Sequence, residues 1–255
     1  MDLVWLCGFA FVAGLVDAIV GGGGLIQLPA LFVFLPEKLA ASVPLVFGTN
    51  KLASMCGTGV AMAQYARRVP IPWRSIVPAA VTAFVFSALG ARVVQSVESD
   101  FLKPLTLALL IAVAIYTYSR KSFGHLHAPR FLADHERLAA MAVGLVIGFY
   151  DGFFGPGTGS FLIFLFIGLF GFDFLTASAS AKVINLATNL AAVIAFAAYD
   201  DVLYGYALPM GACNIAGALV GTRLAILKGN SFVRTLFLGV VAVMIARFAW
   251  EQFAR

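Results

Sequence analysis

The sequence predicts an all-α polytopic membrane protein built from two repeats. Of its 255 residues, 62% are hydrophobic and 11% are charged, and its mean hydropathy is +0.97. This composition excludes an ordinary soluble domain. Several apolar stretches reach the roughly 20 residues that a helix needs to cross a bilayer. We therefore expect a multi-pass protein of the bacterial inner membrane, with the lipid bilayer as its main solvent.

Apolar runs between polar breaks mark the candidate segments. Most are long enough to cross the bilayer, but the second and seventh runs are short and can also be broken or re-entrant helices. We therefore expect about eight to ten segments. In chain order the runs span residues 3–20, 25–36, 40–65, 75–97, 102–119, 138–154, 160–172, 174–198, 203–227 and 232–250.

An internal repeat relates the two halves of the chain. The stretch GLVDAIVGGGGLIQLPAL from Gly14 matches GFYDGFFGPGTGSFLIFL from Gly148. Further matches follow in the same order, and they predict a first transmembrane repeat at 1–119, a cytoplasmic linker at 120–137 and a second repeat at 138–255. The matched residues, first half before second, are Asp17 and Asp151, Lys51 and Lys182, Pro78 and Pro209, and Arg92 and Arg223.

The charges of the loops indicate that the two repeats have inverted topology. In the first half the loop at 67–74 is basic and the loop at 98–100 is acidic, whereas in the second half residues 200–201 are acidic and 228–234 are basic. Basic loops favour the cytoplasm, and inverted repeats need an odd number of crossings each. Five plus five, with both termini outside, fits best; if the short runs are re-entrant, the total falls to eight and this parity argument fails.

Six ionisable residues stand inside the apolar runs at matched positions. A charge at the bilayer centre costs roughly 2.5–3.5 kcal/mol, so such residues usually face a partner or a cavity. In one interpretation the aspartates form buried struts with basic residues and the arginines reach the headgroups. In the other, the basic excess creates a positive cavity that attracts an anion. The candidates for ion pairing or coupling are Asp17, Asp151, Arg92 and Arg223, beside Lys51 and Lys182.

Glycine-rich breaks and uncharged polar residues complete the candidate substrate site. A helix that restarts after such a break presents backbone N–H groups and the positive end of its dipole, which favour an anion. As an alternative, the glycines allow close helix packing and the polar side chains join helices. The predicted substrate-binding residues are Gly21, Gly22, Gly23, Gly24, Thr49, Asn50, Lys51, Gly155, Gly157, Thr158, Ser180, Lys182 and Asn185.

Other classes of function find little support. The three histidines, His125, His127 and His135, all fall in the hydrophilic linker, so neither a metal centre nor a hydrolase triad is expected. The net charge of +5 comes with basic residues in short loops, which orient a membrane protein rather than bind nucleic acid. We expect no cofactor and no enzyme activity.

The paired motifs resemble the TauE/SafE family of bacterial membrane permeases, which is named for sulfite and sulfoacetate export. The resemblance spans nearly the whole chain and implies a proton-coupled transporter of small sulfur anions such as sulfite, sulfoacetate or thiosulfate. An anion channel and a non-transporting subunit of a membrane complex remain alternatives, and small-residue faces allow a homodimer without requiring one. The matching residues are Gly14, Asp17, Gly21 to Gly24, Pro29, Thr49, Asn50 and Lys51, then Gly148, Asp151, Gly155, Gly157, Thr158, Ser180, Lys182 and Asn185.

Overall fold

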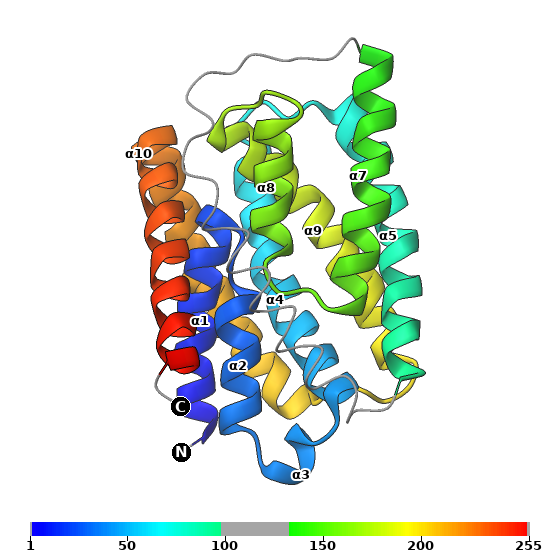
Figure 1. Ribbon diagram of the computed structural model, residues 1–255, viewed down its shortest axis with the longest axis vertical. Coiled ribbons are helices and arrows are strands. Elements are labelled where there is room, and N and C mark those ends of the chain that lie inside the picture. Colours follow the sequence, from blue (N-terminus) through cyan, green and yellow to red (C-terminus); the bar gives the residue numbers. More distant parts are fainter. Residues whose placement is uncertain (1, 98–132, 254–255) are drawn as a thin grey trace.

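The computed structural model describes residues 2–97 and 133–253, and all regular elements in this part of the chain are α-helices (Figure 1). The predicted segment 102–119 and residues 120–132 of the predicted linker lie outside the described residues. The helices are α1 (Asp2–Val20), α2 (Gly24–Phe34), α3 (Glu37–Ala40), α4 (Val43–Ala66), α5 (Trp73–Gln95), α7 (Ala133–Phe153), α8 (Thr158–Gly168), α9 (Phe174–Ala197) and α10 (Tyr204–Phe253).

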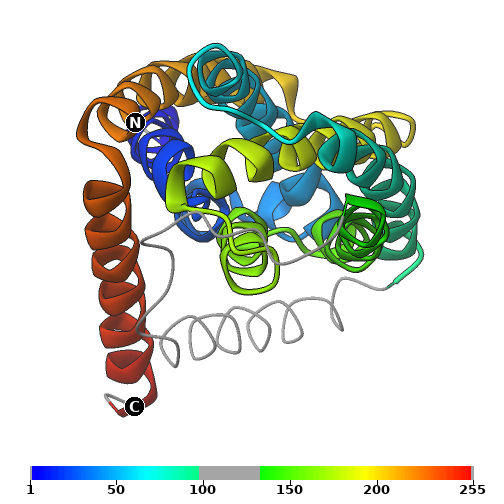
Figure 2. The ribbon, with the colours of Figure 1, turned by 90° about the horizontal axis from the view of Figure 1, so that it is seen from above.

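The long helices match the predicted segments closely. By length and hydropathy α1, α5, α9 and the Tyr204–Gly229 part of α10 can each cross a membrane, so the chain is a multi-pass membrane protein. The backbone of Gly229 is not helical, with a φ of 70°, and Figure 2 shows α10 changing direction along its length. One boundary differs: the chain is already helical at Ala133, before the predicted start near 138.

The two short runs form half-length helices. Each of α2 and α8 has 11 residues, about 16 Å at 1.5 Å per residue, or roughly half of the hydrocarbon core. In Figure 1, α2 returns from the middle of the molecule toward the end where α1 begins, and α8 runs toward the opposite end. The pairs α1–α2 and α7–α8 are therefore helical hairpins. The prediction of five full crossings in each half is wrong for these runs, and the re-entrant alternative describes them.

Glycines make the hairpin tips. Gly21 between α1 and α2 has a φ of +77°, and Gly155 and Gly157 between α7 and α8 have φ values of +96° and +84°. Residues with a Cβ rarely adopt this left-handed backbone. The glycine runs therefore end α1 and α7 and allow the chain to reverse within a few residues.

The two halves pack mainly on each other. A contact made by one helix of the first half with the second half recurs between the matching helices of the opposite halves. Helix α1 packs on α10 while α5 packs on α7, and α4 meets α9 near the centre. A Cβ on Gly14 would lie 2.2 Å from the backbone oxygen of Asn214, and one on Gly148 would lie 2.6 Å from that of Ala83. These two contacts involve matched repeat positions with the halves exchanged. In Figure 1 the matched helices α1 and α7 also run in opposite directions.

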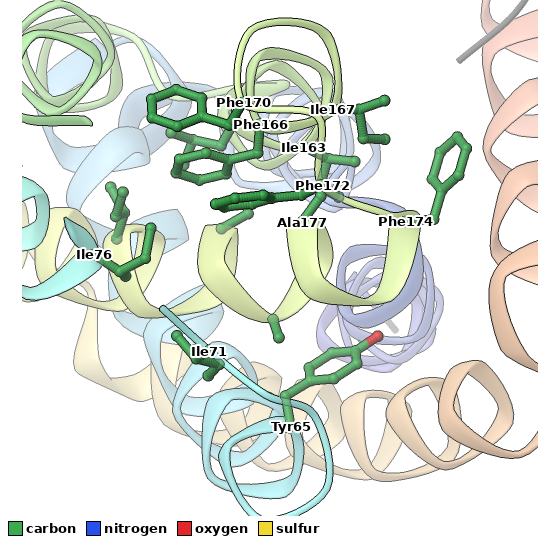
Figure 3. Close-up of a cluster of buried hydrophobic side chains, with 14 of the residues drawn as sticks. Tyr65, Ile71, Ile76, Ile163, Phe166, Ile167, Phe170, Phe172, Phe174 and Ala177 are labelled. Atoms are coloured by element: carbon green, nitrogen blue, oxygen red, sulfur yellow. The ribbon is translucent and has the colours of Figure 1, made fainter. Parts of the chain in front are cut away.

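Aromatic residues fill one large buried cluster beside α8 (Figure 3). The rings of Phe166 and Phe172 stack with their centroids 5.7 Å apart, and Phe170 meets Phe166 edge-on. Tyr65 is fully buried in the same cluster, and its hydroxyl donates a hydrogen bond of 2.9 Å to the backbone oxygen of Ala18. This packing holds the α7–α8 hairpin against α9 and leaves its tip at the centre of the protein.

Gly144→Ala should destabilise the protein. A Cβ there would lie 2.3 Å from the backbone oxygen of Ala79, and overpacking of this kind costs about 1–3 kcal/mol. The matched control is Gly8→Ala, since nothing lies within 4 Å of a Cβ at Gly8. Thermal unfolding of both variants in detergent tests this; equal midpoints would contradict the α5–α7 contact.

Candidate functional site

Two buried ion pairs join the halves at the centre of the protein. Lys51 Nζ of α4 lies 2.7 Å from Asp151 Oδ1 of α7, and Lys182 Nζ of α9 lies 2.7 Å from Asp17 Oδ2 of α1. Each lysine is thus neutralised by the aspartate of the other half. All four of these charges were predicted from the repeat, but the sequence did not indicate which aspartate each lysine would meet.

The two ion pairs have different surroundings. The side chain of Asp151 is 2% exposed and its Oδ2 has no hydrogen-bond partner among the described residues. The side chain of Asp17 is 15% exposed, and its Oδ2 also accepts a 3.3 Å hydrogen bond from the hydroxyl of Thr58. A buried carboxylate oxygen without a partner is costly. The two aspartates therefore differ both in burial and in hydrogen bonding.

The hairpin tips touch each other beside these ion pairs. A Cβ on Gly21 would lie 2.2 Å from the backbone of Gly159, so only glycine allows this approach. The N–H of Ser160 donates to the backbone oxygen of Gly21 at 3.0 Å, and the hydroxyl of Ser160 donates to that of Val20 at 2.9 Å. The first turn of α8, which we expected to offer free N–H groups, thus uses one of them to hold the tips together.

A small, partly open polar cavity of about 20 Å³ lies where the tips meet α4 and α9. It combines backbone from both hairpin tips with side chains from the centres of the two long helices. In this conformation the cavity has room for little more than one water molecule. The predicted residues that line it are Asp17, Gly21, Gly24, Asn50, Lys51, Asp151, Gly155, Gly157, Thr158 and Asn185. Residues that line it but were not among the predicted site residues are Ser54, Thr58, Gly159 and Asn189.

Other predicted site residues lie around the cavity rather than on its wall. Gly22 and Gly23 are within the first tip, and Lys182 lies behind Asp17. The hydroxyl of Thr49 donates to Leu45 and accepts from the N–H of Leu203, so Thr49 joins α4 to the loop before α10. Ser180 is fully buried, and its hydroxyl has no partner among the described residues.

The arginines do not contribute to the cavity. The side chains of Arg92 and Arg223 are exposed, and neither lines the cavity wall. The central charge is therefore set by two lysines and two aspartates, which balance. The predicted positive excess is wrong, because a matched position in a repeat does not tell which face of its helix a side chain occupies.

The sequence patterns did not predict a buried chain of hydrogen-bonded carboxamide side chains that lies beside the cavity. Gln27 of α2 is fully buried; its Nε2 donates to Asn50 Oδ1 at 3.1 Å, and its Oε1 accepts from Asn214 Nδ2 at 2.9 Å. A single glutamine inside the apolar run 25–36 is the signal that could have identified this network. Among the described residues no cluster of three or more His, Cys, Asp or Glu side chains could hold a metal ion.

Multi-pass helices, two glycine-tipped hairpins and a central polar cavity define a polytopic membrane protein with a polar interior. Comparison with known proteins places the chain within this class. Residues 6–248 match the model of the family described as sulfite exporter TauE/SafE. The chain belongs to the TauE/SafE family.

Curated relatives cover nearly the whole chain. It is 36% identical over 249 residues to "Probable membrane transporter protein ORF9" of Sinorhizobium sp, covering 96% of this chain and 90% of the relative. A "Probable membrane transporter protein" of Haemophilus influenzae is 34% identical, with 95% and 92% covered. "Probable membrane transporter protein YfcA" of Escherichia coli K12 is 32% identical, with 95% and 88% covered. These relatives are named as transporters rather than enzymes, and no solved structure matches the chain.

Lys51→Met should destabilise the protein by about 3–5 kcal/mol, because it leaves the charge of Asp151 buried without a partner. The double variant Lys51→Met/Asp151→Leu should recover most of this loss, since both charges are then absent. Thermal and denaturant unfolding in detergent measure the effect, with the exposed Arg92→Met as control. Equal destabilisation of the single and double variants would show that the ion pair does not determine the cost.

Proposed function

We propose that the protein is a proton-coupled secondary transporter, an exporter or permease, of small organosulfur or sulfur-oxyanion solutes such as sulfite, sulfoacetate or thiosulfate. The observation that carries this proposal is the central cavity with a lysine–aspartate pair on its wall. The name of the matching family supports the substrate class, and a bacterial inner membrane is the proposed location. Gly155, Gly157 and Thr158 line the same cavity and join the proposed substrate site.

The ion pair between Lys51 and Asp151 supplies a mechanism for coupling. When Asp151 takes a proton, its bond to the ammonium group of Lys51 weakens, and an anion can occupy its place on the lysine. The site then holds either a carboxylate alone or a proton together with an anion. A charge-balanced exchange of this kind avoids the cost of a lone buried charge. Proton and solute therefore move together, in the direction set by the sum of their gradients.

Alternating access is the proposed way in which the cavity changes sides. The two hairpins approach the centre from opposite ends of the molecule (Figure 1), and the contacts between the halves recur in exchanged form. These features support inverted topology of the repeats 1–119 and 138–255. Rocking of one half against the other would open the cavity to each side in turn.

Purified protein in liposomes distinguishes this proposal from its alternatives. Sulfite, thiosulfate, sulfoacetate, sulfate and chloride are supplied outside while flux, current and internal pH are recorded. Saturable accumulation of a sulfur anion, driven uphill by a pH gradient, is expected of the transporter. An anion channel cannot drive a solute uphill, and a non-transporting subunit moves none of these anions; either result overturns the proposal.

Lys51→Ala and Lys182→Ala should each abolish sulfur-anion flux in liposomes. The first variant loses the proposed anion ligand, and the second leaves Asp17 without its neutralising partner. Arg92→Ala serves as the control, because this exposed side chain lies away from the cavity. Folding is checked by size-exclusion chromatography, and normal flux in both folded lysine variants would contradict the assigned site.

Asp151→Asn should separate anion movement from proton movement. Without the carboxylate, Lys51 has no competing partner and no group that takes the coupling proton. We expect anion counterflow to continue, whereas proton uptake and accumulation driven by a pH gradient are lost. Internal pH is followed with a trapped dye while labelled sulfite exchanges. Unchanged proton coupling in this variant would exclude Asp151 as the proton carrier.

A further inference from the structure

The carboxamide of Gln27 has a fixed orientation. Its Nε2 lies 3.2 Å from the backbone oxygen of Asn50, as well as 3.1 Å from the side-chain Oδ1 of that residue. A backbone oxygen can only accept a hydrogen bond, so the atom of Gln27 that faces it must be the nitrogen. The oxygen of Gln27 therefore points the other way, toward α10.

Asn214 of α10 contacts Gln27 on the side away from Asn50. Its Nδ2 donates to Gln27 Oε1 at 2.9 Å, and its side chain is held between α1 and α4 by two glycines. A Cβ on Gly57 would lie 1.9 Å from Asn214 Oδ1, and one on Gly14 would lie 2.8 Å from the same atom. The side chain of Asn214 therefore has little room to turn, and it keeps the donor end of Gln27 directed at Asn50.

The hydrogen bond from Gln27 fixes the orientation of the Asn50 side-chain amide, which faces the cavity. Its Oδ1 is occupied by Gln27, so its Nδ2 is the half of the amide that remains for a ligand, and Asn50 lines the cavity. No hydrogen bond from this nitrogen to a described residue is present, although the residue is only 5% exposed. On α9, Asn189 Nδ2 donates to Asn185 Oδ1 at 2.7 Å. The side-chain nitrogen of Asn185, which also lines the cavity, therefore remains as a second donor for a ligand.

We propose that Gln27 and Asn214 are positioning residues that fix Asn50 as a hydrogen-bond donor toward the transported solute. This proposal rests on the proposed function. The ligand class that fits is an oxyanion whose exposed oxygens only accept hydrogen bonds, bound between the Asn50 amide and the ammonium group of Lys51. Solutes that present O–H or N–H groups at this point meet a second donor and bind less well.

The test compares Gln27→Met with Gln95→Met in liposomes, with sulfite, thiosulfate and sulfoacetate as probes. Both changes remove a glutamine that bonds two helices, but Gln95 Nε2 donates to the backbone oxygen of Ala195, away from the cavity. We expect KM for the transported anion to rise about tenfold or more in Gln27→Met, the effect of one misplaced hydrogen bond to an ion. We expect kcat to change less than KM, and Gln95→Met to resemble the wild type.

Asn50→Asp keeps the proposal testable if Gln27→Met fails to fold. It preserves the size of the side chain and the acceptor for Gln27, but it places a carboxylate oxygen where the donor nitrogen was. We expect saturable binding of all three anions to disappear while the variant keeps its elution profile in size-exclusion chromatography. Wild-type anion affinity in folded Asn50→Asp would overturn the proposal.

The outcomes separate this inference from the proposed function. If the wild-type protein moves none of the three anions, the proposed function fails, and the inference fails with it. If the wild type transports an anion but Gln27→Met and Gln95→Met have equal KM values, only the positioning role is overturned. A rise in KM confined to Gln27→Met, together with the loss in Asn50→Asp, supports it.

Discussion

Compensation of buried charge is the constraint on which this structure depends. Two lysines lie near the centre of a chain that is otherwise largely apolar, and each is neutralised by an aspartate from the other half. A lone charge at this depth would cost several kcal/mol. Neither half satisfies its own charges in this arrangement, because Lys51 of α4 pairs with α7 and Lys182 of α9 pairs with α1.

The cavity follows from the same constraint. Glycine tips bring both hairpins close enough for the lysines and aspartates to meet, and the remaining space is lined by amides, hydroxyls and backbone. Matched positions of the two repeats carry different side chains and make different hydrogen bonds. Thr58 contacts Asp17 while its counterpart Asn189 contacts Asn185, and Gln27 of the first half matches the apolar Phe161 of the second. Two similar halves therefore enclose an asymmetric site.

Local patterns predicted much of this architecture. The glycine breaks, the lengths of the helices and the depth of Asp17 and Lys51 depend on neighbours in sequence, and the structure agrees with them. The partner of each lysine depends on contacts between the halves, which no local pattern encodes. The outward direction of Arg92 and Arg223 depends on which helix face is covered, and Gln27 has no polar counterpart in the second repeat to draw attention to it.

The exchanged ion pairs also affect how the protein is made. Synthesis proceeds from the N-terminus, so Asp17 and Lys51 leave the ribosome before Asp151 and Lys182 have been translated. The first repeat therefore enters the bilayer with both of its charges lacking their final partners. Final assembly then waits for α9, and a chain truncated before Lys182 would be a natural target for membrane quality-control proteases.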